Sequence, residues 1–293
     1  MSVHPTGIRL WIAGARPKTL PAAVVPVVVG TAAVAEDEFI PWRFLAAMVV
    51  ALALQVGTNY ANDYSDGIRG TDDDRVGPLR LVGSGAASPA QVKAALIASF
   101  VVAGIVGLVL SLAVNPWLLA IGAASIAAGW FYTGGKNPYG YLGLGEVVVF
   151  VFFGIVATTG SAYVQTEELS GLALVLSVPV GVFATALLVI NNLRDREGDE
   201  AMGKTTLAVR LGDSRTRLLY TASMTGAFVL IALVAAVAAR PALLLGLFGF
   251  GVSMPGILAV RAGATGRDLI PVLESTARTQ LVSGLLLTFG LLL

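Results

Sequence analysis

The sequence predicts an all-α, polytopic membrane protein with about nine transmembrane helices. Hydrophobic residues make up 56% of the 293 residues and charged residues only 13%, whereas soluble domains carry about 25% charged residues. The mean hydropathy is +0.82. A chain this poor in charge cannot cover a water-facing surface, so the lipid bilayer must be its main solvent.

The apolar runs are about 20 residues long, the length of membrane spans, and short loops separate them. The first run contains Pro21 and Pro26, and Arg16 and Lys18 precede it. A signal peptide is the alternative interpretation of this run, but no small-residue cleavage site leads from it into a soluble domain. No hydrophilic stretch is long enough for a separate domain, which predicts one membrane domain over residues 1–293. The expected spans are 20–35, 43–60, 91–113, 117–133, 143–163, 169–191, 217–238, 242–260 and 273–293.

The basic residues fall almost entirely on one side of the predicted membrane. With nine spans, all but two of the 19 Lys and Arg residues lie on the same side, and only Arg43 and Arg240 lie on the other. Cytoplasmic loops carry an excess of Lys and Arg. The sequence therefore predicts a multi-pass protein of the cell inner (plasma) membrane, with its active site facing the cytoplasm.

The composition excludes several kinds of chemistry. The chain has no cysteine, so it has no disulfide, thiolate metal site or cysteine nucleophile. Its single histidine, His4, lies near the N-terminus, which argues against a His-ligated metal or a Ser-His-Asp triad. The net charge is +1 and no basic run is present, so no nucleic-acid partner is expected. Any metal must therefore be bound by oxygen ligands.

A first cluster of polar residues closes the second predicted span and contains Asn59, Asn62, Asp63 and Asp66. On a helix, positions 59, 63 and 66 are spaced i, i+4 and i+7, so they share one face with Asn62 beside them. Like charges at close helical spacing repel slightly in a bare helix, and ionisable groups near a membrane are costly and usually mark function. A bound divalent cation would remove this repulsion.

A second cluster closes the sixth predicted span, where Asn191, Asp195 and Asp199 share a helix face. In both clusters an Asn precedes an Asp by four residues at a helix end, which suggests an internal duplication. Because the clusters are four spans apart, an even number of membrane crossings keeps them on the same side. The two clusters are therefore expected to face one another at the cytoplasmic end.

Mg²⁺ suits such a pair of clusters, because it takes one or two carboxylates and fills its octahedron with waters and substrate phosphate oxygens. The alternative is that these are solvated residues that stabilise helix ends, but carboxylates disfavour helix C-termini. Asp72 is a further candidate ligand, with a solvated acidic loop as the alternative. The expected metal ligands are Asn59, Asp63, Asp66, Asn191, Asp195 and Asp199. The expected catalytic residues are Asp63, Asp195 and Lys204.

Basic residues near the two clusters suit an anionic substrate. Arg and Lys bind phosphate groups through charge-assisted hydrogen bonds. The alternative is the general excess of positive charge on cytoplasmic loops, which needs no ligand. The expected phosphate-binding residues are Arg80, Lys136, Lys204 and Arg210.

Aromatic residues lie near the same predicted face, Tyr132 and Tyr139 among them. Aromatic rings can stabilise a developing cation through their quadrupole, and they are also ordinary interfacial anchors. Glu146 is a lone acid just inside the fifth predicted span, where few acids are tolerated. It is expected to orient a basic or aromatic residue of the site.

Together, the two Asp-rich clusters resemble those of the UbiA superfamily of intramembrane aromatic prenyltransferases. The details are most similar to the branch that prenylates 1,4-dihydroxy-2-naphthoate in menaquinone synthesis, and the span pattern covers nearly the whole chain. The family commonly carries the second aspartate of its first motif eight residues after the Asn, where this chain has Gly67 and Asp66 stands one position earlier. The matching stretches are residues 14–21, 59–70, 77–85 and 191–212.

The resemblance implies nine helices around a central cavity that is capped by cytoplasmic loops and opens sideways to lipid. It also implies that Mg²⁺ bridges a polyprenyl diphosphate to the carboxylates of Asp63, Asp66, Asp195 and Asp199. Departure of the diphosphate leaves an allylic cation that alkylates the naphthoate ring, and loss of carboxylate and a proton gives demethylmenaquinone. Either Arg16 or Lys18 is expected to receive the carboxylate of the aromatic acid.

Two alternatives stay open at this point. A related enzyme with another acceptor, such as 4-hydroxybenzoate, haem or a chlorophyll precursor, would differ in the aromatic molecule that it consumes. An ion-coupled transporter would place its coupling carboxylates near the membrane midplane on broken helices. The two Asp clusters instead lie at the cytoplasmic ends of their predicted spans, and this position favours the enzyme.

Overall fold

The computed structural model describes residues 5–70, 77 and 79–293, and every regular element among them is a helix. The prediction of an all-α protein is therefore confirmed. In chain order the elements are α1 (Ile8–Ala15), η1 (Pro17–Thr19), α2 (Pro21–Ala32), α3 (Pro41–Ile68), α4 (Pro89–Ala113), α5 (Leu118–Phe131), η2 (Tyr139–Leu142), α6 (Gly145–Val149), the π-helical η3 (Phe150–Val156), α7 (Ala157–Thr166), α8 (Gly171–Ala201), α9 (Leu207–Val237), η4 (Pro241–Phe248), α10 (Gly249–Arg261), η5 (Gly266–Asp268) and α11 (Leu269–Leu291).

Six segments of the described chain are long and apolar enough to cross a membrane, and the bent pair Ile8–Thr19 and Pro21–Ala32 would make a seventh. The chain is an integral membrane protein. The expected count of nine spans is not confirmed, because α5 has only 14 residues and α11 is not among the six. The polar side chains of α11, including Glu274, Arg278 and Gln280, lower its hydropathy. The six segments are Pro41–Ile68, Pro89–Ala113, Gly145–Thr166, Gly171–Ala201, Leu207–Val237 and Pro241–Arg261.

Local sequence signals account for several helix starts. Ser88 and Gln91 form a capping box at the start of α4, and the Ser170 side chain accepts the N–H of Ala173 at the start of α8. Proline occupies the first position of α2, α3 and α4, where its missing N–H costs nothing. The ends are less predictable from sequence. Both α3 and α8 continue past the predicted span ends at 60 and 191, so both Asp clusters lie on regular helix.

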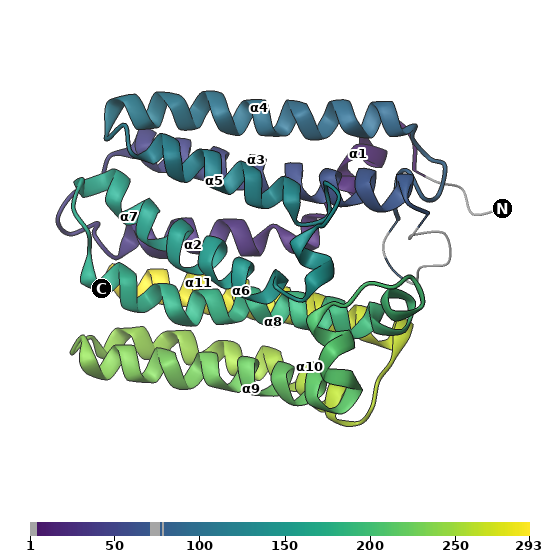
Figure 1. Ribbon diagram of the computed structural model, residues 1–293. Coiled ribbons are helices and arrows are strands. Elements are labelled where there is room, and N and C mark those ends of the chain that lie inside the picture. Colours follow the sequence, from purple (N-terminus) through teal and green to yellow (C-terminus); the bar gives the residue numbers. More distant parts are fainter. Residues whose placement is uncertain (1–4, 71–76, 78) are drawn as a thin grey trace.

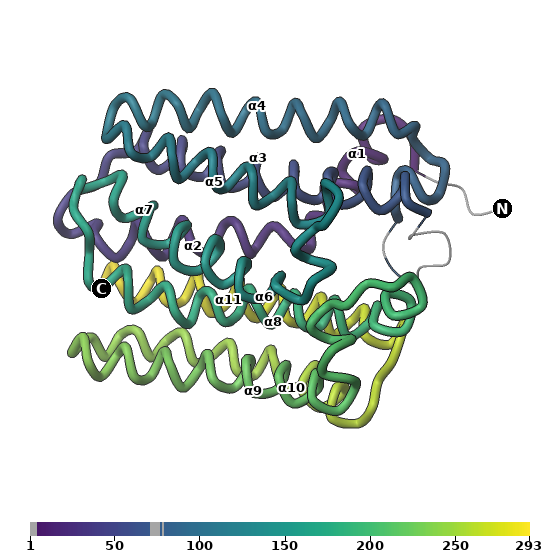
Figure 2. Tube along the Cα trace, viewed as in Figure 1, coloured from purple at the N-terminus to yellow at the C-terminus, as the bar shows by residue number. Residues whose placement is uncertain are grey.

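The long helices lie side by side along one common direction (Figures 1 and 2). In Figure 1, α4, α3 and α5 form one side of the molecule and α9 and α10 form the other, with α2, α7, α11 and α8 between them. The largest interfaces join α3 to α4, α8 to α9, and α11 to η4, α10 and α2. Both α2 and α7 contact α3 and α8, so they lie between the two helices that carry the Asp clusters.

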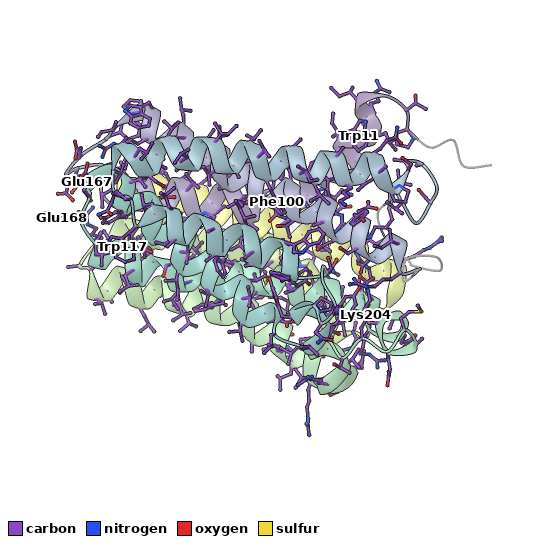
Figure 3. All side chains as sticks on the ribbon, turned by 45° about the horizontal axis from the view of Figure 1, so that its top comes forward. Trp11, Phe100, Trp117, Glu167, Glu168 and Lys204 are labelled. Atoms are coloured by element: carbon purple, nitrogen blue, oxygen red, sulfur yellow. The ribbon has the colours of Figure 1, made fainter. Side chains whose placement is uncertain are left out.

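The two ends of the bundle differ in character. Figure 3 shows Trp117, Glu167 and Glu168 at one end and Lys204 near the other. At the first end, Arg43 pairs with Glu167 (2.9 Å). The second end contains the C-terminal ends of α3 and α8 and the segment between α8 and α9. The expectation that both Asp clusters lie at one end of the molecule is therefore confirmed.

Small residues allow several helices to approach closely. An ideal Cβ built on Gly154 would lie 2.6 Å from the Cα atom of Gly181, and one on Gly30 would lie 2.0 Å from the carbonyl oxygen of Thr158. These contacts join the helix 145–166 to α8 and to α2. Close backbone approach at small residues is a common basis of helix association in membranes, where lipid is as apolar as the helix surface.

Replacement of Gly154 by Ala should destabilise the protein, because the added methyl group meets backbone atoms of α8. Overpacking of this kind costs about 1–3 kcal/mol, which should lower the melting temperature in detergent by several degrees. Gly160→Ala is the matched control on the same continuous helix, since an ideal Cβ there meets no atom of the described residues within 4 Å. Equal melting temperatures for the two variants would contradict the proposed role of the Gly154–Gly181 contact.

Candidate active site

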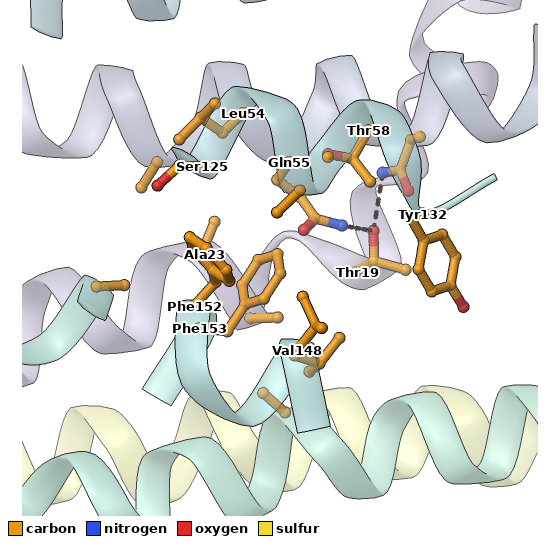
Figure 4. A pocket seen from close by; sticks show the side chains of 18 of the residues that line it. Thr19, Ala23, Leu54, Gln55, Thr58, Ser125, Tyr132, Val148, Phe152 and Phe153 are labelled. Atoms are coloured by element: carbon orange, nitrogen blue, oxygen red, sulfur yellow. Dashed lines mark hydrogen bonds between the residues drawn. The ribbon is translucent and has the colours of Figure 1, made fainter. Parts of the chain in front are cut away.

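A cavity of about 340 Å³ lies inside the bundle, with walls from α2, α3, α5, α8 and the continuous helix 145–166. Figure 4 shows Leu54, Gln55 and Thr58 of α3 on one side of it, with Phe152 and Phe153 across from them. The two phenylalanines belong to the π-helical η3, and π-helical turns inside α-helices often mark functional sites. Most of the wall away from the Asp clusters is apolar, which suits a hydrocarbon ligand.

The charged residues of the cavity wall are balanced, with three carboxylates and three cations. They belong to the half of the cavity nearer the C-terminal ends of α3 and α8. Charges in such a poorly solvated wall interact strongly, so a multiply charged anion would need a further cation to bind there. The six residues are Arg16, Asp66, Arg80, Asp195, Asp199 and Lys204.

In the first cluster, Asn62 and Asp66 line the cavity. The carboxylate of Asp66 is only 3% exposed and accepts a hydrogen bond from the Tyr141 hydroxyl. Lys204 Nζ lies 3.3 Å from one of its oxygens and Arg80 Nη2 lies 3.8 Å from the other. Asn62 Oδ1 accepts the hydroxyl of Thr133 at 2.8 Å. The described contacts of Asp66 thus link α3 to three other segments of the chain.

Asp63 and Asn59 bind neighbouring segments of the protein. Asp63 is fully buried, is missing from the described cavity wall, and accepts the backbone N–H groups of Leu81 and Val82. Asn59 lines the cavity, but its amide donates to the carbonyl of Ala15 and the hydroxyl of Thr19. Asn59, Asn62 and Asp66 therefore border the cavity, as the second cluster does, whereas Asp63 does not; metal binding by Asn59 and Asp63 stays a prediction of the sequence.

The second cluster lies on the cavity as the sequence predicts, and Asn191, Asp195 and Asp199 all line it. Arg194 donates to both carboxylate oxygens of Asp195, from Nε at 2.8 Å and from Nη2 at 2.7 Å. The same guanidinium donates to Asn191 Oδ1 at 2.9 Å. Arg194 is buried, and burial of its charge is compensated by this bidentate pair.

Lys204 joins the two clusters. Its ammonium lies 3.3 Å from Asp66 Oδ1 on α3 and 3.6 Å from Asp199 Oδ1 on α8. Its Nζ atom also lies over the Tyr141 ring, 4.6 Å from the ring centroid, which is a favourable cation–π geometry. A positive charge thus sits between carboxylates from two segments that are far apart in the sequence. The prediction that Lys204 belongs to the site is consistent with this position.

The donor set at this end fits Mg²⁺. No group of three or more Asp, Glu or His side chains is close enough to enclose a metal ion by itself in the described part of the chain. Mg²⁺ needs no such cage, because one or two carboxylates suffice when waters and phosphate oxygens complete the octahedron. Asp66 and Asp199, both within 3.6 Å of one ammonium, already share a cation between them. These residues therefore fit a metal that is bound together with a phosphate ligand.

The structure separates the four expected phosphate-binding cations into two pairs. Arg80 and Lys204 are buried and line the cavity. Lys136 is exposed in the segment after α5, and Arg210 is exposed on the first turn of α9, where its Nε donates to the carbonyl of Thr205. Neither of these two belongs to the described cavity wall.

Tyr132 and Tyr139 both line the cavity. Their rings pack edge to face, with centroids 5.6 Å apart, and the hydroxyl of Tyr139 donates to the carbonyl of Ala128. Burial raises the pKa of Tyr139, and burial together with the nearby Asp66 carboxylate raises the pKa of Tyr141. Both phenols stay protonated at neutral pH, so they act as hydrogen-bond donors with intact, electron-rich rings.

The two candidates for binding an acceptor carboxylate differ in position. Arg16 lines the cavity, and its buried Nη2 atom has no hydrogen-bond partner among the described residues. Lys18 is exposed and pairs with Glu274 on α11. Arg16 has a left-handed backbone (φ 52°), which is strained for a residue with a side chain. The strained turn is tied to α3, because Thr19 donates to the Arg16 carbonyl and accepts from Gln55 (Figure 4).

Glu146 has a partner that the sequence does not reveal. Asn192, next to the second cluster, donates to its carboxylate at 2.9 Å, and both residues are buried. The pair connects the start of the helix 145–166 to α8. The expectation that Glu146 orients a basic or aromatic residue is therefore not supported by this contact, since its described partner is an amide.

The sequence indicated Tyr141 only as one of several aromatic residues near the site, gave no role to Arg194, and gave Asn62 only a secondary place. A signal for Asn62 was present, because Asn62 precedes Asp66 by four residues just as Asn191 precedes Asp195. For the other two residues, nothing in the spacing distinguishes a site residue from a loop charge or an interfacial aromatic. Asp72, which was a further candidate ligand, lies outside the described residues.

Proteins of known sequence and structure resemble the chain over most of its length. The chain is 50% identical over 273 residues, 93% of each chain, to the 1,4-dihydroxy-2-naphthoate octaprenyltransferase of Mycobacterium tuberculosis. It is 38% identical to the Escherichia coli protein of the same name, over 97% of this chain and 95% of that one.

Solved structures share the fold. A UbiA homolog from Archaeoglobus fulgidus bound to DMAPP and Mg²⁺ superposes with a TM-score of 0.64 at 13% identity, over 94% of this chain and 98% of that one. The apo structure of a UbiA homolog from Aeropyrum pernix gives a TM-score of 0.68 at 15% identity, over 98% of both chains. A family model described as the UbiA prenyltransferase family matches residues 23–269. The resemblance seen in the two Asp-rich clusters is confirmed, and the chain belongs to the UbiA prenyltransferase family.

Proposed function

We propose that the chain is a Mg²⁺-dependent aromatic prenyltransferase. It transfers a polyprenyl group from polyprenyl diphosphate to 1,4-dihydroxy-2-naphthoate, with loss of diphosphate and CO₂, and so makes demethylmenaquinol, the reduced form of demethylmenaquinone, for menaquinone synthesis. The observation that carries this proposal is the junction of an apolar cavity with a charged end in which Lys204 links carboxylates of α3 and α8. The names of the relatives, at up to 50% identity, support the choice of acceptor.

At the charged end, we assign Asp66, Asp195 and Asp199 to the metal, with Asn62 and Asn191 beside them. Bound Mg²⁺ would supply electrostatic stabilisation of the departing diphosphate. Among the described residues, the cavity wall carries three carboxylates and three cations, so these residues leave no excess positive charge for a diphosphate. This balance explains why the residues present call for a divalent cation, and the Mg²⁺-bound relative from Archaeoglobus fulgidus supports that choice.

Arg80 and Lys204 are the proposed diphosphate-binding cations. Both are buried at the cavity wall and lie within 4 Å of Asp66. With the Asp66 carboxylate bound to a metal, the ammonium and guanidinium would be available to hold phosphate oxygens by charge-assisted hydrogen bonds. Lys136 and Arg210 stay predictions of the sequence, since they lie outside the described wall.

The apolar part of the cavity is the proposed place of the prenyl chain. Phe152, Phe153 and Leu54 line it, and a hydrocarbon gains free energy there by leaving water. The Tyr132 and Tyr139 rings lie where the apolar and charged parts meet, and their faces can stabilise the allylic cation that forms when the C–O bond to diphosphate breaks. A dry cavity also keeps water from capturing this cation.

Arg16 is the proposed receptor for the carboxylate of the naphthoate. Its guanidinium borders the cavity and has a buried nitrogen without a described partner. Thr19, Gln55 and Asn59 hold the turn that carries it. A fixed guanidinium would orient the aromatic ring so that its nucleophilic carbon, and not its carboxylate, faces the allylic carbon.

We further propose that residues 1–293 form one membrane domain in the cell inner membrane, with the charged cavity end toward the cytoplasm. The distribution of Lys and Arg supports this orientation. Nine helical crossings around the cavity remain our proposal, with α2, α5 and α11 as the crossings that add to the six long apolar segments. A substrate with a long apolar tail would then enter from the bilayer.

Replacement of Asp66 or Asp195 by Asn should lower kcat/KM at least about 100-fold, because each change removes one charge from the metal and leaving-group site. The assay measures prenylated naphthoquinol formed from 1,4-dihydroxy-2-naphthoate, a polyprenyl diphosphate and Mg²⁺ in detergent. EDTA should abolish the product. Asp37→Asn, an exposed Asp at the opposite end of the bundle, is the matched control. Prenylation of a different aromatic acid instead would change the acceptor, and no prenylation of any acceptor would overturn the enzyme proposal.

Replacement of Arg16 by Gln should raise the KM for the naphthoate about 10- to 100-fold, the cost of a lost hydrogen bond to a charged group. The KM for the diphosphate should change less than about 3-fold, because Arg16 is not expected to hydrogen-bond to the diphosphate. Lys18→Gln serves as the matched control, since Lys18 pairs with Glu274 outside the cavity wall. A larger effect of Lys18→Gln on the naphthoate KM would reverse the assignment, and an equal effect of Arg16→Gln on both substrates would move Arg16 to the diphosphate.

A further inference from the structure

The carboxylate of Asp63 binds the segment that follows the described end of α3. Its Oδ2 atom accepts the backbone N–H of Leu81 at 2.8 Å, and its Oδ1 atom accepts that of Val82 at 3.0 Å. The residue is 0% exposed. Two consecutive N–H groups at the start of a helical turn form a natural seat for a carboxylate, because they point in nearly the same direction and are otherwise without acceptors.

The segment held by Asp63 is a compact turn. The N–H of Ser84 donates to the Arg80 carbonyl at 3.0 Å, and that of Ala87 donates to the Leu81 carbonyl at 2.9 Å. The Leu81 side chain is fully buried in a cluster that includes Tyr60 of α3 and Phe100 of α4. The turn is therefore fixed both by its own hydrogen bonds and by an apolar anchor.

The turn also lies directly against α3. An ideal Cβ on Gly67 would come within 2.4 Å of the Val82 Cβ atom, so only glycine allows this approach. Gly67 is one helical turn beyond Asp63, on the same side of α3. The turn 80–85 therefore contacts α3 at two positions one helical turn apart. Its N–H groups bind the Asp63 carboxylate, and Val82 packs against Gly67.

Arg80 immediately precedes the two N–H groups that Asp63 binds. It is buried, lines the cavity, and brings its Nη2 atom to 3.8 Å from Asp66 Oδ2. Asp63 and Asp66 are three residues apart on α3, but the Asp63 carboxylate binds the turn whereas Asp66 borders the cavity. The position of the Arg80 guanidinium therefore depends on a backbone whose described anchor is the Asp63 carboxylate.

We propose that Asp63 is a positioning residue that fixes the turn 80–85 and so presents Arg80 to the diphosphate. This inference rests on the proposed function and assigns Asp63 a role different from the direct metal contact that the sequence predicts. Both of its carboxylate oxygens face N–H donors of the turn, whereas Asp66, Asp195 and Asp199 border the cavity. Asp63 acts on the substrate through Arg80.

A double-mutant cycle between Asp63 and Arg80 tests the proposal by binding, without turnover. Isothermal titration measures the affinity of the detergent-purified protein for geranyl diphosphate with Mg²⁺ and without acceptor. Asp63→Asn and Arg80→Gln should each weaken binding about 10-fold, in the range for a lost charge-assisted hydrogen bond, and the double variant should be no weaker than Arg80→Gln alone. Multiplicative losses in the double variant would overturn the proposal, since independent effects add in free energy.

The Mg²⁺ requirement separates positioning from metal ligation. Asp66→Asn should raise the Mg²⁺ concentration needed for half-maximal binding of geranyl diphosphate, whereas Asp63→Asn should leave that concentration unchanged. An equal rise for Asp63→Asn would identify Asp63 as a ligand and overturn the inference. Failure of the wild-type protein to bind geranyl diphosphate at any Mg²⁺ concentration would instead count against the proposed function.

Gly67→Ala provides a second route if Asp63→Asn does not fold. This change leaves every carboxylate in place and pushes the turn away from α3, because the added methyl group meets Val82. It should weaken geranyl diphosphate binding about as much as Asp63→Asn and should have little further effect in the Arg80→Gln background. Unchanged binding by a folded Gly67→Ala protein would overturn the proposal. Faster amide exchange of residues 79–87 in either variant would support it.

Discussion

The buried ammonium of Lys204 is the contact on which the charged end of the cavity depends. It lies between Asp66 of α3 and Asp199 of α8. Removal of one partner from a buried ion pair typically costs 3–5 kcal/mol, because the other charge stays in a medium that cannot solvate it. Carboxylates on two helices and a cation on a third segment therefore hold one another at a separation that also suits a metal and a phosphate group.

The segment between α5 and α6 is fixed by the same end of the bundle. Arg69, at the end of α3, donates to the carbonyls of Thr133 and Gly135. The Tyr141 carbonyl accepts both the N–H and the hydroxyl of Thr205, next to Lys204. Tyr132, Tyr139 and Tyr141 are thereby held beside the carboxylates, although they lie far from either Asp cluster in sequence. The aromatic and ionic parts of the site are one structure.

The contrast between the two parts of the cavity has a simple electrostatic origin. Charged side chains in a membrane protein are tolerated where each has a partner or reaches water, and the end of the bundle near Lys204 supplies both. The apolar part, with Phe152, Phe153 and Leu54, has no such compensation and holds no charged residue among those described. A ligand with an anionic head and a hydrocarbon tail matches this division, with its head at the carboxylates and its tail among the phenylalanines.

The sequence by itself determined the all-α class, the membrane environment and the position of both Asp clusters at one end of the molecule. The hydrophobic composition indicates the bilayer as solvent, and an even number of predicted crossings places the two Asp clusters on the same side of it. Neither inference depends on details of packing. It also identified Asp66, Asp195, Asp199, Arg80, Lys204, Tyr132 and Tyr139, all of which border the cavity.

Only the tertiary structure decided which residues of a shared helix face meet the cavity. Helical spacing places Asn59, Asp63 and Asp66 on one broad face. The turn that carries Leu81 and Val82 lies against one edge of that face, and its N–H groups donate to the Asp63 carboxylate. Arg16 and Lys18 are separated in the same way, because Arg16 lines the cavity whereas Lys18 pairs with Glu274 of α11 outside its described wall. Periodicity along one helix cannot specify such contacts, since the partners come from segments that are distant in sequence and meet only when the bundle is packed.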